Sequence, residues 1–114
     1  MAVEDAAAFA AALSHVNSES NPQYSLSRAM GVFESVRTKR SNQMQQASLI
    51  NGKLWHLRDG PEQHARDEAM RPEVIGEKFE TSPNQWSDPV TQAWAYGYDA
   101  AKEIELAFKK AADI

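Results

Sequence analysis

The chain has no cysteine among its 114 residues. This absence excludes a disulfide framework, a thiol nucleophile and a thiolate metal site. Long apolar runs are also missing, since none reaches the roughly 20 residues that a transmembrane helix needs. The alanine-rich start carries Glu4 and Asp5 instead of the lysines of a signal peptide. Together these absences predict a soluble cytoplasmic protein that does not associate with membranes.

The chain also lacks a strong charge of one sign, because its net charge is −4. This weak acidic excess argues against nucleic acid as the main partner, since phosphate binding needs a local excess of cations. Hydrophobic residues make up 42% and charged residues 25% of the sequence, as in an ordinary globular protein. The length corresponds to one domain. We therefore expect residues 1–114 to form a single helical domain.

The C-terminal stretch from Asp88 to Ala112 carries the clearest helical pattern. Asp88 is a good N-cap residue, and Pro89 suits the first helical position, where no backbone N–H is needed. Lys109 and Lys110 lie where a helix C-terminus favours cations. We expect one long helix around which the rest of the chain packs. Its buried stripe steps by three and four residues: Val90, Trp94, Gly97, Ala101, Ile104, Phe108 and Ala111.

Two helices are expected in the N-terminal half. Residues 3–16 repeat apolar side chains at helical spacing and are rich in alanine. A second helix should start near Ser25 or Ser27, because serine is a favoured N-cap residue. The polar stretch 37–43 leaves two alternatives, a single long and partly exposed helix or a helix that stops near Arg40. We favour the long helix.

The segment around Asn51-Gly52 is ambiguous. Asn-Gly between apolar residues is a strong signal for a β-hairpin, here near 48–57, because a type I′ turn needs two residues with positive φ. The same pair can end a helix, with glycine in the left-handed position after the last turn. The sequence leaves both alternatives open.

A third helix is expected to begin at Glu62, and Arg71-Pro72 should break or kink it. Further helical turns should follow over residues 73–79, and a loop over 80–87. The predicted fold is therefore mainly α. It is a compact bundle of four or five helices around the long C-terminal helix, with at most a small β-hairpin near 48–57.

Aromatic residues cluster near the start of the C-terminal helix. Trp94 lies on the predicted stripe, whereas Tyr96 and Tyr98 flank it on opposite sides. One interpretation is a core helix packed on several sides. The other is a partner-binding surface formed by Trp86, Tyr96 and Tyr98, because interfaces are enriched in tryptophan and tyrosine. The regular stripe also favours a symmetric homodimer in which this helix meets its own copy.

Basic residues concentrate between positions 28 and 40. Arg28, Arg37, Lys39 and Arg40 could form an anion-binding or nucleic-acid-binding face. The alternative is a solvated helix surface whose cations pair with nearby acids. No aromatic residue interleaves the run, and no RNA-binding signature is present.

Residues with metal-binding or acid–base chemistry are few. His64 and Glu68 share a helix face, but their spacing with His56 matches no metalloenzyme signature. No nucleophile elbow and no glycine-rich phosphate loop occurs. We therefore predict no catalytic residue, no metal and no cofactor.

These observations favour a non-enzymatic accessory protein that acts by binding another macromolecule. We expect this macromolecule to be a protein. One form of this hypothesis is an inhibitor of a host system encoded by a phage or another mobile element. The first alternative is a nucleic-acid-binding module that uses the basic face over 28–40. The second is a small metal-dependent enzyme built on His56, His64 and Glu68.

Overall fold

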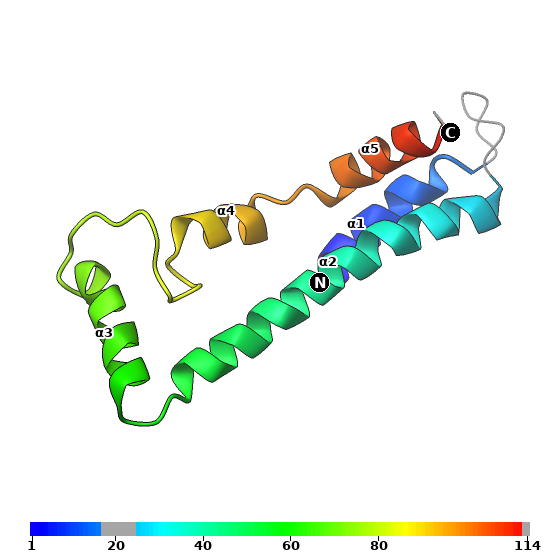
Figure 1. Cartoon of the computed structure of the whole chain (residues 1–114). Helices are drawn as coiled ribbons and strands as arrows, with labels where there is room; N and C mark the ends of the chain where they lie inside the picture. Colours follow the sequence, from blue (N-terminus) through cyan, green and yellow to red (C-terminus); the bar gives the residue numbers. More distant parts are fainter. Residues whose placement is uncertain (17–24, 113–114) are drawn as a thin grey trace. The chain divides into compact units, whose positions relative to one another are not determined.

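The computed structural model describes residues 1–16 and 25–112, and this part of the chain is helical without any strand (Figure 1). The mainly α fold is therefore confirmed, and the β-hairpin near 48–57 is wrong. A single compact bundle is not supported either, because the chain divides into two compact units. The described residues form five helices: α1 (Ala2–Leu13), α2 (Leu26–Trp55), α3 (Pro61–Val74), α4 (Pro89–Tyr96) and α5 (Ala100–Ala112).

The two units share helix α2. The first unit comprises Met1–Met44 and Asp99–Ile114, so it contains α1, the first part of α2 and α5. The second unit is Gln45–Tyr98, which contains the end of α2, α3, a loop and α4. None of the helices in the described ranges is long and apolar enough to cross a membrane.

The prediction of one long second helix is confirmed. Ser25 caps α2, since its Oγ accepts a hydrogen bond from the Arg28 backbone N–H at 3.2 Å. The helix continues through Gly52, so both alternatives for Asn51-Gly52 were wrong. A glycine inside a helix costs only about 1 kcal/mol relative to alanine. The Asn51 side chain supports the helical turn by accepting a hydrogen bond from Trp55 Nε1 at 3.0 Å.

Helix α3 is longer than predicted because Pro72 does not break it. Proline lies in its last turn, where it removes one backbone hydrogen bond close to an end that frays in any case. The helix ends at Val74, and Gly76 follows two residues later with a left-handed φ of 80°. Backbone bonds from Gly76 to Glu73 and from Glu77 to Pro72 complete a Schellman cap. The helical turns expected over 73–79 are therefore missing beyond this cap.

The long C-terminal helix is also wrong, because it is interrupted between Tyr96 and Ala100. Asp99 starts a new helix there, and its Oδ1 accepts a hydrogen bond from the Lys102 backbone N–H at 3.0 Å. The predicted stripe is correct only in part. Ile104 and Phe108 are buried, whereas Val90, Gly97 and Ala101 are exposed. The predicted caps are confirmed: Asp88 and Pro89 begin α4, and Lys109 and Lys110 lie in the last turn of α5.

The first unit packs around the alanine-rich helix α1. Helix α5 lies beside it (Figure 1), and the end of α1 meets the end of α5, because the His15 ring stacks on Phe108 with centroids 4.1 Å apart. Helix α2 runs antiparallel to α1, as the edge-to-face contact of Phe9 with Phe33 at 5.7 Å indicates. The buried apolar side chains among the described residues are mostly small: Ala8, Ala12, Ala29, Ala100, Ile104 and Phe108.

Because Phe108 is the largest of these side chains, Phe108→Ala should lower the free energy of unfolding by on the order of 3–5 kcal/mol. Urea denaturation of the purified chain measures this change. Leu106→Ala is the matched control on the same helix, since Leu106 is 43% exposed, and it should cost well under half as much. Equal losses for the two variants would show that α5 does not bury Phe108.

Candidate interaction surfaces

Two buried arginines of α2 hold the start of α1 through ion pairs with two partly exposed acids. Arg37 Nε lies 2.7 Å from Asp5 Oδ1, and Arg37 Nη2 lies 3.0 Å from Glu4 Oε2. Arg40 forks across the same Glu4 carboxylate with contacts of 3.0 and 3.2 Å. Arg37 and Arg40 are only 4% and 2% exposed. Both acids of α1 are therefore turned toward α2.

The ion pairs change the titration of Glu4. The hydrogen bond from Arg40 is the largest effect, and together with Arg37 it holds the pKa of Glu4 below its ordinary value despite the opposing effect of burial. The carboxylate therefore stays charged at neutral pH and under mildly acidic conditions. Its contribution to folding is present above the ordinary pKa and is lost as the pH falls through the lowered value.

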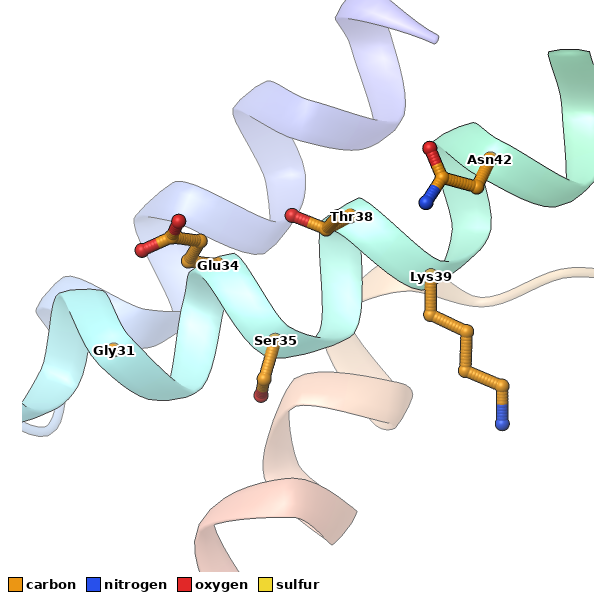
Figure 2. A pocket seen from close by; sticks show the side chains of 6 residues that line it. All are labelled: Gly31, Glu34, Ser35, Thr38, Lys39 and Asn42. Carbon is orange, nitrogen blue, oxygen red and sulfur yellow. The ribbon is translucent and has the colours of Figure 1, made fainter.

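The four predicted anion-binding residues do not form one surface. Arg37 and Arg40 are buried in these ion pairs, and Arg28 Nη2 donates to the Ala111 carbonyl at 3.1 Å. Lys39 is exposed at a shallow depression on α2 that also includes Glu34 (Figure 2). Figure 2 shows the side chains of this depression spread along one helix instead of converging. Anion or nucleic-acid binding stays a prediction for this region.

All three aromatic residues of the surface predicted from the sequence lie in the second unit, and Tyr98, its last residue, is half-buried. Trp86 is 67% exposed and Tyr96 is 70% exposed. The exposed side of α4 carries no charged residue, and Thr91 and Gln92 of this helix are half-buried. We call this side the α4 face; together with Trp86 it consists of Pro89, Val90, Ala93, Tyr96 and Gly97.

The loop before α4 is folded around the carboxylate of Glu73, which belongs to α3. Ser87 Oγ donates to both Glu73 oxygens at 2.8 and 2.9 Å, Asn84 Nδ2 donates at 3.1 Å, and Ser82 Oγ donates as well. These hydrogen bonds, with that of Ser82 the strongest, hold the pKa of Glu73 below its ordinary value. A charged Glu73 therefore organises the loop that carries Trp86.

Asp88 completes this loop and begins α4. Its Oδ2 accepts hydrogen bonds from the Thr91 hydroxyl at 2.7 Å and the Thr91 backbone at 2.9 Å, and its Oδ1 accepts one from the Ser82 backbone at 2.8 Å. The bonds from Thr91 are foremost in lowering the pKa of Asp88. The backbone of Trp86 is fixed by two hydrogen bonds. Its backbone N–H donates to Asn84 Oδ1, and its carbonyl accepts from Gln92 Nε2.

Sequence reasoning identified Asp88 but missed Glu73. The signal was the polar set Ser82, Asn84 and Ser87 in a short loop, since such side chains often hydrogen-bond a nearby acid. The partner lies 9 to 14 residues earlier. Nothing in the spacing distinguishes Glu73 from the other acids of the region.

Two of the three predicted candidates for metal chemistry have other partners. His56 Nδ1 contacts the carbonyl of Gly52 at 2.7 Å, and Glu68 pairs with Arg71. In the ranges that the structure describes, no group of three histidine, aspartate or glutamate side chains could hold a metal ion.

Comparison with known proteins shows that the chain is similar to part of a longer enzyme. The similar protein is FAD-dependent monooxygenase OpS4 of Beauveria bassiana (strain ARSEF 2860), which is 32% identical over 99 residues. These residues are 87% of this chain and 22% of that enzyme, so the chain spans about a fifth of the length of this relative. No family model and no solved structure matches the chain.

The described residues do not form a FAD-binding site by themselves. Dinucleotide sites use glycines at a strand-to-helix turn, where the backbone approaches the pyrophosphate closely. The described ranges contain no strand. At four of the five glycines a Cβ atom would meet nothing within 4 Å, and at Gly97 it would meet only Ala93 in the preceding turn. No cradle for a dinucleotide is built from these residues.

The lowered pKa of Glu4 predicts a specific pH dependence. Glu4→Gln should lower the melting temperature at neutral pH, because it weakens the pairing with Arg37 and Arg40. The difference from the parent chain should shrink as the pH falls below the ordinary value of 4.5, since the parent then loses the same charge. Thermal melts at a series of pH values measure this difference. Glu34→Gln, at an exposed glutamate of α2, is the control and should show no such convergence; a constant difference for Glu4→Gln would contradict the pairing.

The cap of α4 makes a second prediction. Asp88→Ala should destabilise the chain by about 1 kcal/mol or somewhat more, because it removes an N-cap and leaves the Ser82 N–H without its acceptor. Asp88→Asn should cost less, since asparagine is also a good N-cap. Chemical denaturation monitored by tryptophan fluorescence checks this order. Equal stability of the alanine variant and the parent would contradict the described loop.

Proposed function

We propose that this chain is a helical interaction segment of a FAD-dependent monooxygenase and binds the remaining part of such an enzyme through exposed apolar side chains. The proposal keeps the protein partner predicted from the sequence and assigns it a class. The chain then supplies packing surface and no catalytic group. The observation that carries the proposal is the uncharged, exposed α4 face together with Trp86.

The composition of the α4 face supports a contact with protein. A helix at the surface of a stable monomer normally turns charged and polar residues to water and buries its apolar side. Helix α4 departs from this pattern: Thr91 and Gln92 are half-buried along with Trp94, whereas Val90 and Tyr96 are 68% and 70% exposed. Exposed apolar patches of this kind usually mark interfaces, and tryptophan and tyrosine are enriched in them.

The small core supports the same proposal. Four of the six buried apolar residues in the described part of the chain are alanines, and Ile104 is the largest side chain that is fully buried there. Larger apolar side chains are spread over the surface instead, among them Val74, Ile75 and Leu49. Burying them against a second polypeptide would add about 1.5–3 kcal/mol for each large side chain.

The similarity to the Beauveria bassiana enzyme supports the proposed class of partner. The match covers 87% of this chain but 22% of the enzyme, which leaves most of that polypeptide to supply the opposing surface. The predicted homodimer relied on a continuous stripe, and the interruption between Tyr96 and Ala100 removes that support. No specific feature of the described residues favours a phage inhibitor or a metal-dependent enzyme.

A chimera tests the proposed function. This chain replaces the matching region of the intact Beauveria bassiana monooxygenase, and bound FAD is measured from its visible absorbance after gel filtration. We expect a soluble chimera that retains FAD. The double variant Trp86→Ser/Tyr96→Ser should lose FAD and melt at a lower temperature, because large interface aromatics each contribute about 2 kcal/mol or more.

The matched control is Glu77→Ser/Lys78→Ser, which changes two exposed residues of the same unit outside the α4 face. It should behave like the parent chimera. A parent chimera that folds no flavoprotein at all would overturn the proposed function, and so would a Trp86→Ser/Tyr96→Ser variant that matches the control.

A further inference from the structure

The exposed side of α1 is apolar, although the helix carries two acids, and Phe9 lies at its edge, where its ring also contacts Phe33 of α2. Val3 is 85% exposed, and Phe9 and Leu13 are 43% and 40% exposed. Ala6 and Ala10 lie between them and are exposed too. We call these five residues the α1 face. No charged or polar side chain of Ala2–Leu13 lies on it, because Glu4 and Asp5 are on the opposite side.

The ion pairs determine this orientation. Arg37 and Arg40 hold Glu4 and Asp5 against α2, while Ala8 and Ala12 are fully buried on the same side. Helix periodicity then places Val3, Ala10 and Leu13 outward. A rotation that buried Val3 and Leu13 instead would separate both carboxylates from the buried guanidinium groups, which is strongly unfavourable. The outward apolar side is therefore built into the packing of the first unit.

The size and charge of the α1 face indicate which kind of partner covers it. Its 12 residues span about 18 Å, and a helix is roughly 10 Å wide. The resulting area is about 180 Å², far below the roughly 800 Å² that each partner contributes to a stable interface. A second copy meeting only this face would not hold. A polypeptide that also contacts the chain elsewhere would form a stable interface. Because the α1 face carries no charge, the surface of that polypeptide must be apolar.

We infer that the α1 face is a second docking surface, which binds an uncharged apolar surface of the same flavoenzyme partner. The inference rests on the proposed function, in which the remaining polypeptide already contacts the α4 face. The relative has enough chain outside the matched residues for both contacts, since these residues are 22% of its length. The α1 face lies in the first unit and the α4 face in the second, so each unit contributes its own contact.

The test places charge on the α1 face of the chimera. Val3→Arg/Ala10→Arg introduces two arginines seven residues apart on the exposed side. The control Ser35→Arg/Asn42→Arg has the same spacing and charge on the exposed polar side of α2. In the isolated chain both variants should keep the parent's helical circular dichroism, because arginine has almost the helix propensity of alanine. In the chimera only Val3→Arg/Ala10→Arg should lose bound FAD and melt at a lower temperature than the parent chimera.

The outcomes separate the two proposals. If Val3→Arg/Ala10→Arg and the control give the same FAD content and melting temperature, while Trp86→Ser/Tyr96→Ser still impairs the chimera, the α1 face is not a docking surface and the proposed function stands. If the parent chimera holds no FAD, the proposed function fails and this inference fails with it. Loss of helix in the isolated Val3→Arg/Ala10→Arg chain would show that the chain itself covers the face, which also overturns the inference.

Discussion

The pairing of Glu4 and Asp5 with Arg37 and Arg40 is the interaction on which the first unit depends. Helix α1 has few other means of fixing its rotation, because most of its side chains are alanines of similar size. A buried ion pair adds little net stability compared with apolar packing, but removing one partner is costly. The arginines therefore select one orientation of α1, and that orientation turns its apolar residues outward.

The second unit uses carboxylates in a comparable way. Glu73 and Asp88 gather the backbone and side chains of the loop between them, and this loop holds Trp86 at the surface. In both units, buried or half-buried polar groups determine local structure while large apolar side chains remain exposed. This division is unusual for an independent globule and is expected of a segment that folds against a larger protein.

The parts of the fold that could be predicted were those determined by neighbouring residues. The Asp88-Pro89 start of α4 and the serine cap of α2 are local signals, and both are confirmed. The continuation of α2 through the polar stretch 37–43 was predicted, but its end at Trp55 was not. The interruption before Ala100 was missed because Gly97 and Ala101 continue the helical spacing, whereas Asp99 acts as a new cap. Local pattern alone does not decide between a helix that continues and one that restarts.

The candidate site was less predictable, because its contacts join distant residues. Arg37 and Arg40 looked like an anion-binding pair, and their acidic partners lie 32 to 36 residues away in sequence. Acidic residues near the arginines in the same helix would have predicted such ion pairs. Acidic residues in another helix leave no pattern in the sequence that predicts them. Trp86 and Tyr96 were predicted as partner-binding residues from composition, and they are exposed. Their partner is a proposal that composition alone does not supply.

The most direct test of this account uses the absence of cysteine from the chain. Single thiols are introduced by Ala10→Cys on the α1 face and by Ala12→Cys on the buried side, where Ala12 is 0% exposed. Their alkylation by a water-soluble maleimide is followed by mass spectrometry of the peptide that contains each thiol. We predict that the Ala10→Cys thiol reacts rapidly in the isolated chain and becomes protected in the chimera, whereas the Ala12→Cys thiol is protected in both. An Ala10→Cys thiol that reacts equally fast in both proteins, or that is already protected in the isolated chain, would contradict the account.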